Sequence, residues 1–215
     1  MLGLTYKRFW KRIIDILGAA TLLVMLSPVL MIVALAVRLK LGSPILFKQE
    51  RLGLNGRTFE IFKFRSMTNE RDENGALLED QHRLTKFGKL LRDWSLDELP
   101  QLWNVLVGDM GLIGPRPFIA EYASRYTTEQ MRRHEVRPGI SGWAQVTGRN
   151  SISWNQKFIL DVWYVDHCSF LLDIKILLLT LPVVLNRTGI SAEDHVTMPK
   201  WTGRIEDAEE KVLSE

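Results

Sequence analysis

Two adjacent carboxylates, Asp97 and Glu98, stand where a run of apolar residues with helical spacing begins. Free N–H groups and the macrodipole at a helix N-terminus favour negative charge, so a carboxylate there remains ionised and can serve as a nucleophile or a metal ligand. Arg92 precedes the pair and could neutralise a phosphate. Ser95 with Glu98 also fits a capping box, and Asp97 fits the cap before Pro100, so the spacing alone favours a structural cap.

Two further cations lie on a predicted β-strand. Strands are expected over Pro44–Arg51 and Thr58–Met67, around a turn that contains Asn55-Gly56. Alternation along the second strand puts Lys63 and Arg65 on one face, about 7 Å apart, where they could grip a diphosphate. Taken alone, these two side chains fit a solvated strand face better than a phosphate site.

A third arginine is held between two prolines. Pro115 and Pro117 restrict the backbone on both sides of Arg116 and keep it extended. An arginine held in this way loses little backbone entropy when it binds an anion. The sequence therefore offers several cations to a ligand that carries phosphate.

Motifs of other chemistries are absent from the sequence. It contains no GxxxxGK[ST], GxGxxG, HExxH or GxSxG pattern. The four histidines show no metal-ligand spacing, and His134 and His167 are expected to be structural. Oxygen-ligand chemistry remains, with carboxylates and Mg²⁺ acting on a phosphate-containing substrate.

The composition fits one domain with a real core. The chain has 215 residues, of which 46% are hydrophobic. The 28 Lys and Arg residues against 25 Asp and Glu give a net charge of +3, which is too small to indicate a nucleic-acid binder. Cys168 is the only cysteine, so an intramolecular disulfide and a thiolate metal site are excluded, and a reducing compartment is expected.

An uncharged stretch near the N-terminus is long enough to cross a membrane. Residues 16–37 contain no charge, and a straight helix of this length would span the roughly 30 Å hydrocarbon core. Ser27-Pro28 lies at its middle, where proline removes a helical hydrogen bond and predicts a kink whose freed backbone group Ser27 can satisfy. Basic residues flank both ends, so the positive-inside rule prefers neither orientation. A kinked span and a re-entrant hairpin both fit this spacing.

The rest of the chain predicts mainly helices. A basic helix is expected at about His82–Trp94, a short one at Phe118–Arg125, and further helices after the caps Thr127…Gln130 and Ser153…Gln156. Leu171–Leu185 is apolar but contains charges and a proline, so we expect an amphipathic helix that packs on the domain or lies in a membrane interface. The predicted fold class is α+β and mainly helical, with a small β-hairpin and amphipathic interfacial helices.

Six motifs occur together between about Lys11 and Gly203. They are Lys11-Arg12 before the helix broken at Ser27-Pro28, Phe-Lys63-Phe-Arg65-Ser-Met, Arg92 followed by Ser-Leu-Asp97-Glu98-Leu-Pro, Pro115-Arg116-Pro117, Arg137-Pro-Gly-Ile-Ser-Gly-Trp143-Ala-Gln145-Val-Thr-Gly-Arg149-Asn, and Leu160-Asp161-Val-Trp-Tyr164. With these motifs the chain resembles the small monotopic phosphoglycosyl transferases, the bacterial sugar transferases that begin glycan assembly on polyprenyl phosphate.

The resemblance implies transfer of a sugar 1-phosphate from a UDP-sugar to undecaprenyl phosphate, with release of UMP and a covalent phosphosugar intermediate on Asp97. It implies Mg²⁺ as cofactor, held by Glu98 together with Asp97. It also implies the re-entrant form of the N-terminal helix, broken at Ser27 and Pro28. The residues that it implies for substrate binding are Lys63, Arg65, Arg92, Arg116, Arg137, Gln145, Arg149 and Asp161.

The same resemblance implies how the chain is organised. Residues 1–40 would form the membrane-embedded helix-break-helix, and residues 41–203 a cytoplasmic catalytic domain at the interface. Residues 204–215 lie beyond the resemblance, and their acidic, terminal sequence predicts a mobile tail. The protein would be monotopic in the bacterial inner membrane, with membrane lipids and downstream glycosyl transferases of the same pathway as partners. The segment Gly189–Gly203 is similar to members that use UDP-N,N′-diacetylbacillosamine for protein glycosylation.

Two other functions stay open on the residues alone. One is a glycosyl transferase in which Asp97 acts as a base and UDP is released. The other is a membrane-anchored binding protein in which Asp97-Glu98 is only a cap, so that Ser95→Ala costs about 1 kcal/mol of helix stability and no turnover is found. The identity of the released nucleotide distinguishes the three functions.

Overall fold

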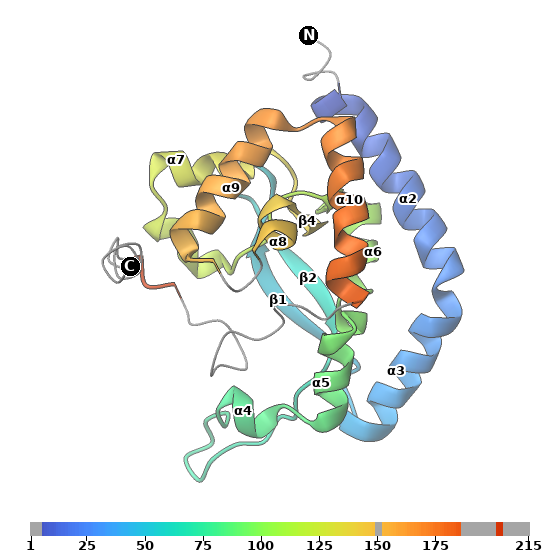
Figure 1. The fold of residues 1–215 in the computed structure, drawn as a ribbon. Helices are drawn as coiled ribbons and strands as arrows, with labels where there is room; N and C mark the ends of the chain where they lie inside the picture. The colour runs from blue at the N-terminus through green and yellow to red at the C-terminus, as the bar shows by residue number, and fades with distance from the viewer. Residues whose placement is uncertain (1–5, 149–151, 186–200, 204–215) are drawn as a thin grey trace.

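The computed structural model of the chain describes residues 6–148, 152–185 and 201–203 (Figure 1). The described part is mainly helical with two small sheets, so the predicted α+β class is confirmed. The helices are α2 (Lys11–Met25), α3 (Ser27–Leu41), α4 (Asp80–Arg83), α5 (Lys86–Asp93), α6 (Gln101–Val107), α7 (Thr128–Met131), α8 (Trp143–Thr147), α9 (Trp154–His167) and α10 (Phe170–Leu185). The strands are β1 (Leu46–Leu52), β2 (Thr58–Phe64), β3 (Gly111–Ile113) and β4 (Gly139–Ser141).

The strands β1 and β2 form the predicted antiparallel hairpin. Leu46 pairs with Phe64, and the pairing continues to the turn. Asn55 has a φ of 54°, the left-handed conformation that asparagine tolerates better than most residues. Turn chemistry and strand alternation together therefore explain this element.

Asn104, on α6, covers the outer edge of the hairpin. Its fully buried side chain accepts the Phe62 N–H at 3.1 Å and donates to the Glu60 carbonyl at 2.7 Å. These are backbone groups of β2 that an exposed edge would leave unpaired. The amide thus fixes α6 against the strand that carries Lys63.

The strands β3 and β4 form a second, parallel sheet that the sequence pattern did not predict. A Cβ atom on Gly139 would lie 2.1 Å from the backbone nitrogen of Gly114, so the two chains approach more closely than side chains allow. The Gly139 N–H donates to the Pro115 carbonyl at 3.0 Å. This sheet therefore fixes the start of the segment that contains Arg116.

The helices α2 and α3 run along one edge of the molecule and meet at the predicted break (Figure 1). The Ser27 hydroxyl donates to the Val24 carbonyl at 2.8 Å. In a regular helix that carbonyl would receive an N–H from residue 28, but Pro28 has none. Within the described residues no single helix has the length and composition of a membrane span, whereas α2 and α3 together have them and are bent by 64°.

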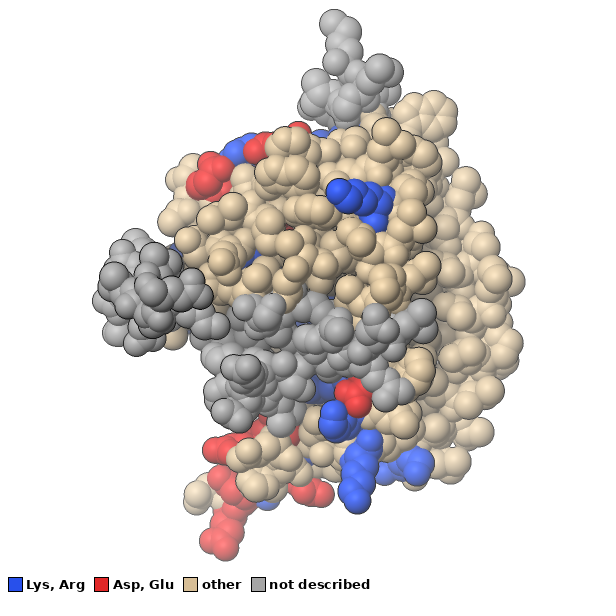
Figure 2. All heavy atoms as spheres, viewed as in Figure 1, with Lys and Arg blue, Asp and Glu red and all other residues tan. Residues whose placement is uncertain are grey.

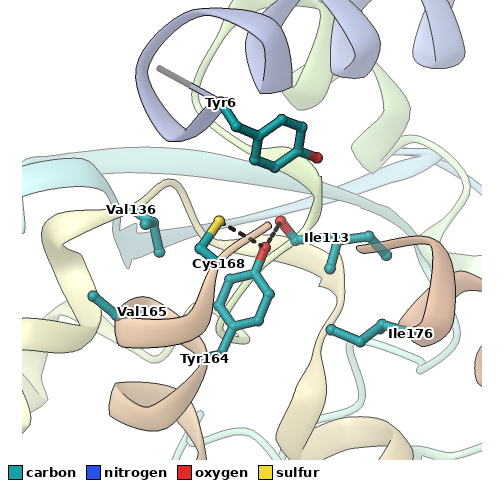
Figure 3. Packing of buried hydrophobic residues seen from close by; sticks show 7 residues of the cluster. All are labelled: Tyr6, Ile113, Val136, Tyr164, Val165, Cys168 and Ile176. Carbon is teal, nitrogen blue, oxygen red and sulfur yellow. Dashed lines mark hydrogen bonds between the residues drawn. The ribbon is translucent and has the colours of Figure 1, made fainter. Parts of the chain in front are cut away.

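The first turns of the chain are anchored by a buried carboxylate. Asp173 of α10 accepts hydrogen bonds from Tyr6, Lys11 and Tyr164, each at 2.6 Å. Figure 3 shows Tyr6 above the apolar cluster, with the Tyr164 hydroxyl between Cys168 and the Ile113 carbonyl. The carboxylate of Asp173, within the helix predicted at Leu171–Leu185, is therefore buried in a polar network. Of the two placements expected for this helix, packing on the domain is the one that the structure shows.

The predicted basic helix at His82–Trp94 is interrupted, which corrects that expectation. The short α4 ends at Arg83, and α5 begins only after Thr85. The Thr85 side chain accepts the Gly88 N–H at 2.9 Å and acts as an N-cap. The capping boxes predicted at Thr127 and Ser153 are both confirmed.

Candidate active site

Asp97 and Glu98 lie in a short 3-10 turn, Leu96–Glu98, between α5 and α6. The expected cap is wrong, because Ser95 adopts a left-handed conformation with φ of 54° and its side chain makes no capping hydrogen bond. The α6 helix begins after Pro100, likewise without a side-chain cap. The two carboxylates are therefore not occupied in closing the end of a helix.

Glu98 is held by two cations from distant parts of the chain. Oε1 of Glu98 accepts Lys63 Nζ at 2.6 Å and Arg116 Nη2 at 2.6 Å, and Oε2 lies 3.5 Å from Arg116 Nη1. Burial alone would raise the pKa of Glu98, but the attraction and hydrogen bonds of Arg116 and Lys63 outweigh it and hold this pKa below its usual range. Glu98 is thus a carboxylate that stays ionised.

Asp97 is buried, and its pKa shifts in the opposite direction to that of Glu98. Burial, followed by repulsion from Glu98, raises the pKa of Asp97 to about 6, against the opposing charges of Lys63, Arg92 and Arg116. Two adjacent carboxylates with pKa values driven apart are a frequent arrangement where the two groups have different chemical roles. At neutral pH the Asp97 carboxylate remains mostly ionised but is poorly solvated.

Arg92 reaches the pair from the last turn of α5. Its Nε donates to the Ser66 hydroxyl at 3.0 Å, and its charge acts on Asp97. A Cβ atom on Gly88 would lie 1.7 Å from the Ser66 carbonyl oxygen, so α5 is in backbone contact with the segment that directly follows β2. This close packing fixes α5 at the distance from which the Arg92 charge acts on Asp97.

The structure gathers part of the predicted site around Asp97 and Glu98 and gives the remainder other contacts. Arg65 is buried, and its Nη1 donates to the Ser43 carbonyl at 2.8 Å, so it does not share a partner with Lys63. Arg137 donates to the Gly108 carbonyl at 2.8 Å, at the end of α6. Gln145 donates to the Ile140 carbonyl at 2.9 Å. Arg149 lies outside the described residues.

Asp161 contacts a residue that the motifs did not single out. Its Oδ2 accepts Arg133 Nη2 at 2.7 Å and Nε at 3.1 Å, and both side chains are buried. Arg133 stands in the run Arg132-Arg133-His134, which in sequence looks like a solvated charge cluster. Nothing local in that run indicates a buried arginine.

Arg51 is a second cation that the sequence analysis missed. It lies on the hairpin close enough to Arg116 and Glu98 for their charges to act on it, and burial, followed by repulsion from Arg116, lowers its pKa to about 10. Arg51 pairs with Phe59 and Lys63 pairs with Phe47, so strand alternation puts both cations on one face of the hairpin. That alternation was the signal that could have found it.

The carboxylates are of a type that suits Mg²⁺. No cluster of three or more His, Cys, Asp or Glu side chains occurs among the residues that the structure describes. Protein sites for Mg²⁺ commonly use only one or two carboxylates and complete the shell with water and substrate phosphates. Asp97 and Glu98 could supply these one or two carboxylates. The described residues do not offer enough ligands for a metal site made entirely of protein groups.

Comparison with known proteins points to one family. Residues 6–187 match the bacterial sugar transferase family. The chain is 55% identical to the uncharacterized sugar transferase EpsL of Bacillus subtilis (strain 168), over 90% of this chain and 96% of the relative. It is 39% identical to the UDP-N-acetylgalactosamine-undecaprenyl-phosphate N-acetylgalactosaminephosphotransferase of Aeromonas hydrophila, over 84% of this chain and 45% of that relative.

A third relative gives the same result. The chain is 40% identical to the UDP-glucose:undecaprenyl-phosphate glucose-1-phosphate transferase of Escherichia coli (strain K12), over 81% of this chain and 40% of the relative. It thus spans less than half of the last two relatives and nearly all of the first. The chain therefore belongs to the bacterial sugar transferase family of phosphoglycosyl transferases, as its motifs predicted.

Proposed function

We propose that the protein transfers a sugar 1-phosphate from a UDP-sugar to undecaprenyl phosphate and releases UMP. The observation that carries this proposal is the pair Asp97 and Glu98, whose pKa values shift in opposite directions among Lys63, Arg92 and Arg116. The relatives from A. hydrophila and E. coli are named as transferases between UDP-sugars and undecaprenyl phosphate, which supports the same substrate classes here.

In the proposed first step, a carboxylate oxygen of Asp97 attacks the sugar-bearing phosphorus of the UDP-sugar. The bond from that phosphorus to the bridging oxygen breaks, and UMP leaves with the bonding electrons. In the second step, a phosphate oxygen of undecaprenyl phosphate attacks the same phosphorus, and the Asp97 carboxylate is regenerated. Burial favours this role, because a poorly solvated carboxylate loses less hydration when it becomes a nucleophile.

The neighbouring cations would keep the reacting groups in place. Arg92 and Arg116 bind phosphate oxygens and stabilise the charge that develops on them, and Lys63 holds Glu98 in its ionised form. Mg²⁺, when bound by Glu98 and Asp97 with the diphosphate, would screen the negative charge that otherwise repels an attacking carboxylate. Asp97 is then both ionised and able to approach phosphorus.

The helices α2 and α3 are proposed to enter one leaflet of the bacterial inner membrane and return to its cytoplasmic face. In Figure 2 the edge that these helices occupy in Figure 1 shows no Lys, Arg, Asp or Glu over most of its length. Large apolar side chains are exposed on both sides of the break, among them Val24, Met25, Met31 and Ile32. The Ser27 hydrogen bond satisfies the backbone at the tip, which an apolar environment requires.

The proposed topology can be measured with two single cysteines. Phe9 and Asn55 are exposed before and after the helix pair. Phe9→Cys and Asn55→Cys, each combined with Cys168→Ala, should react with a membrane-impermeant thiol reagent from the same side of inside-out vesicles. Labelling from opposite sides would contradict the re-entrant form and indicate a kinked span.

The sugar is proposed to be N-acetylated, with N,N′-diacetylbacillosamine as the preferred candidate and protein glycosylation as the pathway. The resemblance of Gly189–Gly203 to transferases of that sugar supports it, as does the N-acetylgalactosamine of one relative's name. Downstream glycosyl transferases of the same pathway would then consume the lipid-linked product.

The nucleotide product tests the proposed function. Purified protein in detergent is incubated with Mg²⁺, undecaprenyl phosphate and each member of a panel of UDP-sugars. UMP that appears with one donor, and disappears when Mg²⁺ is chelated, is the expected result. UDP would indicate a glycosyl transferase with Asp97 as base, and no nucleotide from any donor would favour a binding protein.

A further inference from the structure

A buried ion pair lies beneath the segment that presents Arg116 to Glu98. Arg133, in the 3-10 turn Arg132–Glu135, and Asp161, in the middle of α9, have side chains that are 1% and 3% exposed. Both Nε and Nη2 of Arg133 contact one carboxylate oxygen of Asp161. A buried ion pair is weak evidence for stability, because an apolar pair of similar volume is often equally stable. Its presence therefore calls for another explanation.

Arg133 also grips the Arg116 segment directly. Its Nη2 donates to the backbone carbonyl of Arg116 at 2.6 Å, and its guanidinium lies 4.0 Å from the centre of the Phe118 ring. From that backbone position the side chain of Arg116 extends to Glu98, where its Nη2 donates to Oε1 at 2.6 Å. A continuous set of charge-assisted contacts therefore leads from Asp161 through Arg133 to Arg116 and Glu98.

We propose that Asp161 and Arg133 are positioning residues for Arg116, an inference that rests on the proposed function. Asp161 orients the Arg133 guanidinium, and Arg133 holds the Arg116 backbone so that its side chain reaches both Glu98 and a substrate phosphate. The planar fork of arginine holds its donors in fixed directions toward the Asp161 carboxylate and the Arg116 carbonyl. The ammonium of lysine at position 133 is a compact charge on a flexible stem and would not hold the two acceptors in this fixed geometry. The activity expected of Asp161 from its motif is thereby exerted through Arg116.

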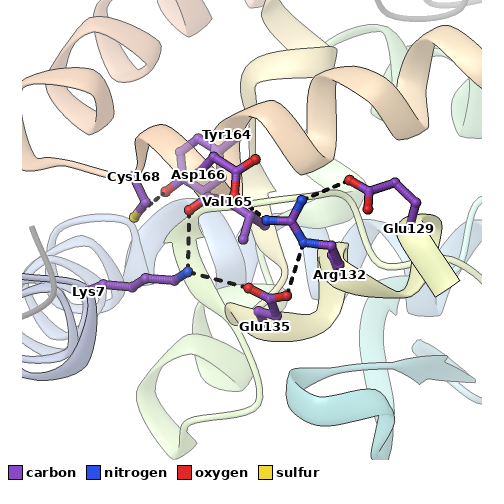
Figure 4. Close-up of polar contacts among 8 residues, drawn as sticks. All are labelled: Lys7, Glu129, Arg132, Glu135, Tyr164, Val165, Asp166 and Cys168. Atoms are coloured by element: carbon purple, nitrogen blue, oxygen red, sulfur yellow. Dashed lines mark hydrogen bonds and ion pairs between the residues drawn. The ribbon is translucent and has the colours of Figure 1, made fainter.

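A neighbouring ion pair provides a matched control. Asp166, also on α9, pairs with Arg132 of the same 3-10 turn, and Figure 4 shows this contact together with Glu129 and Glu135. The pair joins the same two elements as Arg133 and Asp161, but it is exposed and does not contact Arg116. Asp166→Asn therefore removes an exposed link between the same two elements without disturbing the contacts from Asp161 through Arg133 to Arg116.

The test is a double-mutant cycle of Asp161→Asn and Arg116→Ala, read as kcat/KM for the UDP-sugar. In the wild-type background Asp161→Asn should lower kcat/KM by about tenfold or more, and in the Arg116→Ala background by less than about twofold, because no guanidinium remains to be positioned. The melting temperature should fall by the same amount in both backgrounds. Asp166→Asn should leave kcat/KM unchanged.

Other readouts keep the cycle decisive. The dissociation constant of UDP, measured by calorimetry, is determined for all four proteins in case turnover is below detection. Arg133→Lys should reproduce the loss seen in Asp161→Asn while keeping the charge. Equal fold-losses from Asp161→Asn in the two backgrounds would overturn the inference. If Asp97→Asn remained active, the proposed function would fail instead, whatever the result of the cycle.

Discussion

Lys63 and Glu98, 35 positions apart in the chain, meet at 2.6 Å between Nζ and Oε1. The contact joins the β-hairpin to the turn that carries both carboxylates, and it helps to keep Glu98 ionised while the pKa of Asp97 rises. The pKa values of these two neighbouring carboxylates therefore differ because of burial and tertiary contacts, and not because of a helix N-terminus.

Replacing Lys63 should damage the reaction more than the fold. Lys63→Ala removes one of two cations on Glu98 and lets its pKa rise, and we expect kcat/KM to fall by about a hundredfold. Lys48 is the matched control, since it lies on the same hairpin in an exposed ion pair with Glu60. Lys48→Ala should change neither activity nor melting temperature appreciably. Equal effects of the two substitutions on UMP release would argue against a special role for Lys63.

Gly88→Ala tests the packing that places Arg92. The added methyl group would lie 1.7 Å from the Ser66 carbonyl oxygen, so α5 must shift and carry Arg92 with it. Loss of both thermal stability and activity is expected, although alanine favours a helix more than glycine does. Lys86→Ala, at an exposed position of the same helix, is the comparison. Full activity in Gly88→Ala would show that the position of α5 does not matter for the reaction.

Asn104→Ala should destabilise the junction between α6 and the hairpin. The substitution leaves the Phe62 N–H and the Glu60 carbonyl without their partner, and we expect the free energy of unfolding to fall by about 3 kcal/mol. Thermal unfolding followed by circular dichroism measures the change. The exposed Asn69 serves as control, and Asn69→Ala should unfold as the wild type does. Matching curves for all three proteins would contradict the structural role given to Asn104.

His134 should make stability depend on pH. Burial, followed by repulsion from Arg133, lowers its pKa from 6.5 to about 4, despite its hydrogen bond to the Gly53 carbonyl. Because the unfolded histidine binds a proton already below about pH 6.5, the free energy of unfolding should fall by about 3 kcal/mol between pH 6.5 and pH 4. His134→Gln should flatten this part of the pH profile, while exposed His82→Gln should not. Parallel profiles for wild type and His134→Gln would refute the assignment.

Local features could be predicted from the sequence, and the contacts of the site could not. The break at Ser27-Pro28 and the turn at Asn55 depend only on residues a few positions apart, so both could be predicted from the local sequence. The cap expected at Ser95 does not form, because Ser95 adopts a left-handed conformation without a capping hydrogen bond. Glu98 instead accepts hydrogen bonds from Lys63 and Arg116, which lie 35 and 18 positions away in the chain.

Dependence on long-range contacts also explains why Arg133 and the second sheet could not be predicted. Arg133 finds Asp161 at 28 positions and the Arg116 carbonyl at 17, and only the folded chain brings them together. The parallel pairing of β3 with β4 is also non-local, and each strand is too short for its alternation to be recognised. By contrast, Arg92 precedes Asp97 by only a few positions in the chain, and in the folded protein its charge acts on that carboxylate.

The most direct test is to trap the intermediate in the absence of the acceptor lipid. Wild-type protein with Mg²⁺ and the preferred UDP-sugar should release about one equivalent of UMP, and mass spectrometry after acid quenching should find the phosphosugar on the peptide that contains Asp97. Asp97→Asn should give neither, whereas Asp93→Asn, on the nearby α5, should give both. Release of UDP, an adduct on another residue, or turnover by Asp97→Asn would contradict the account.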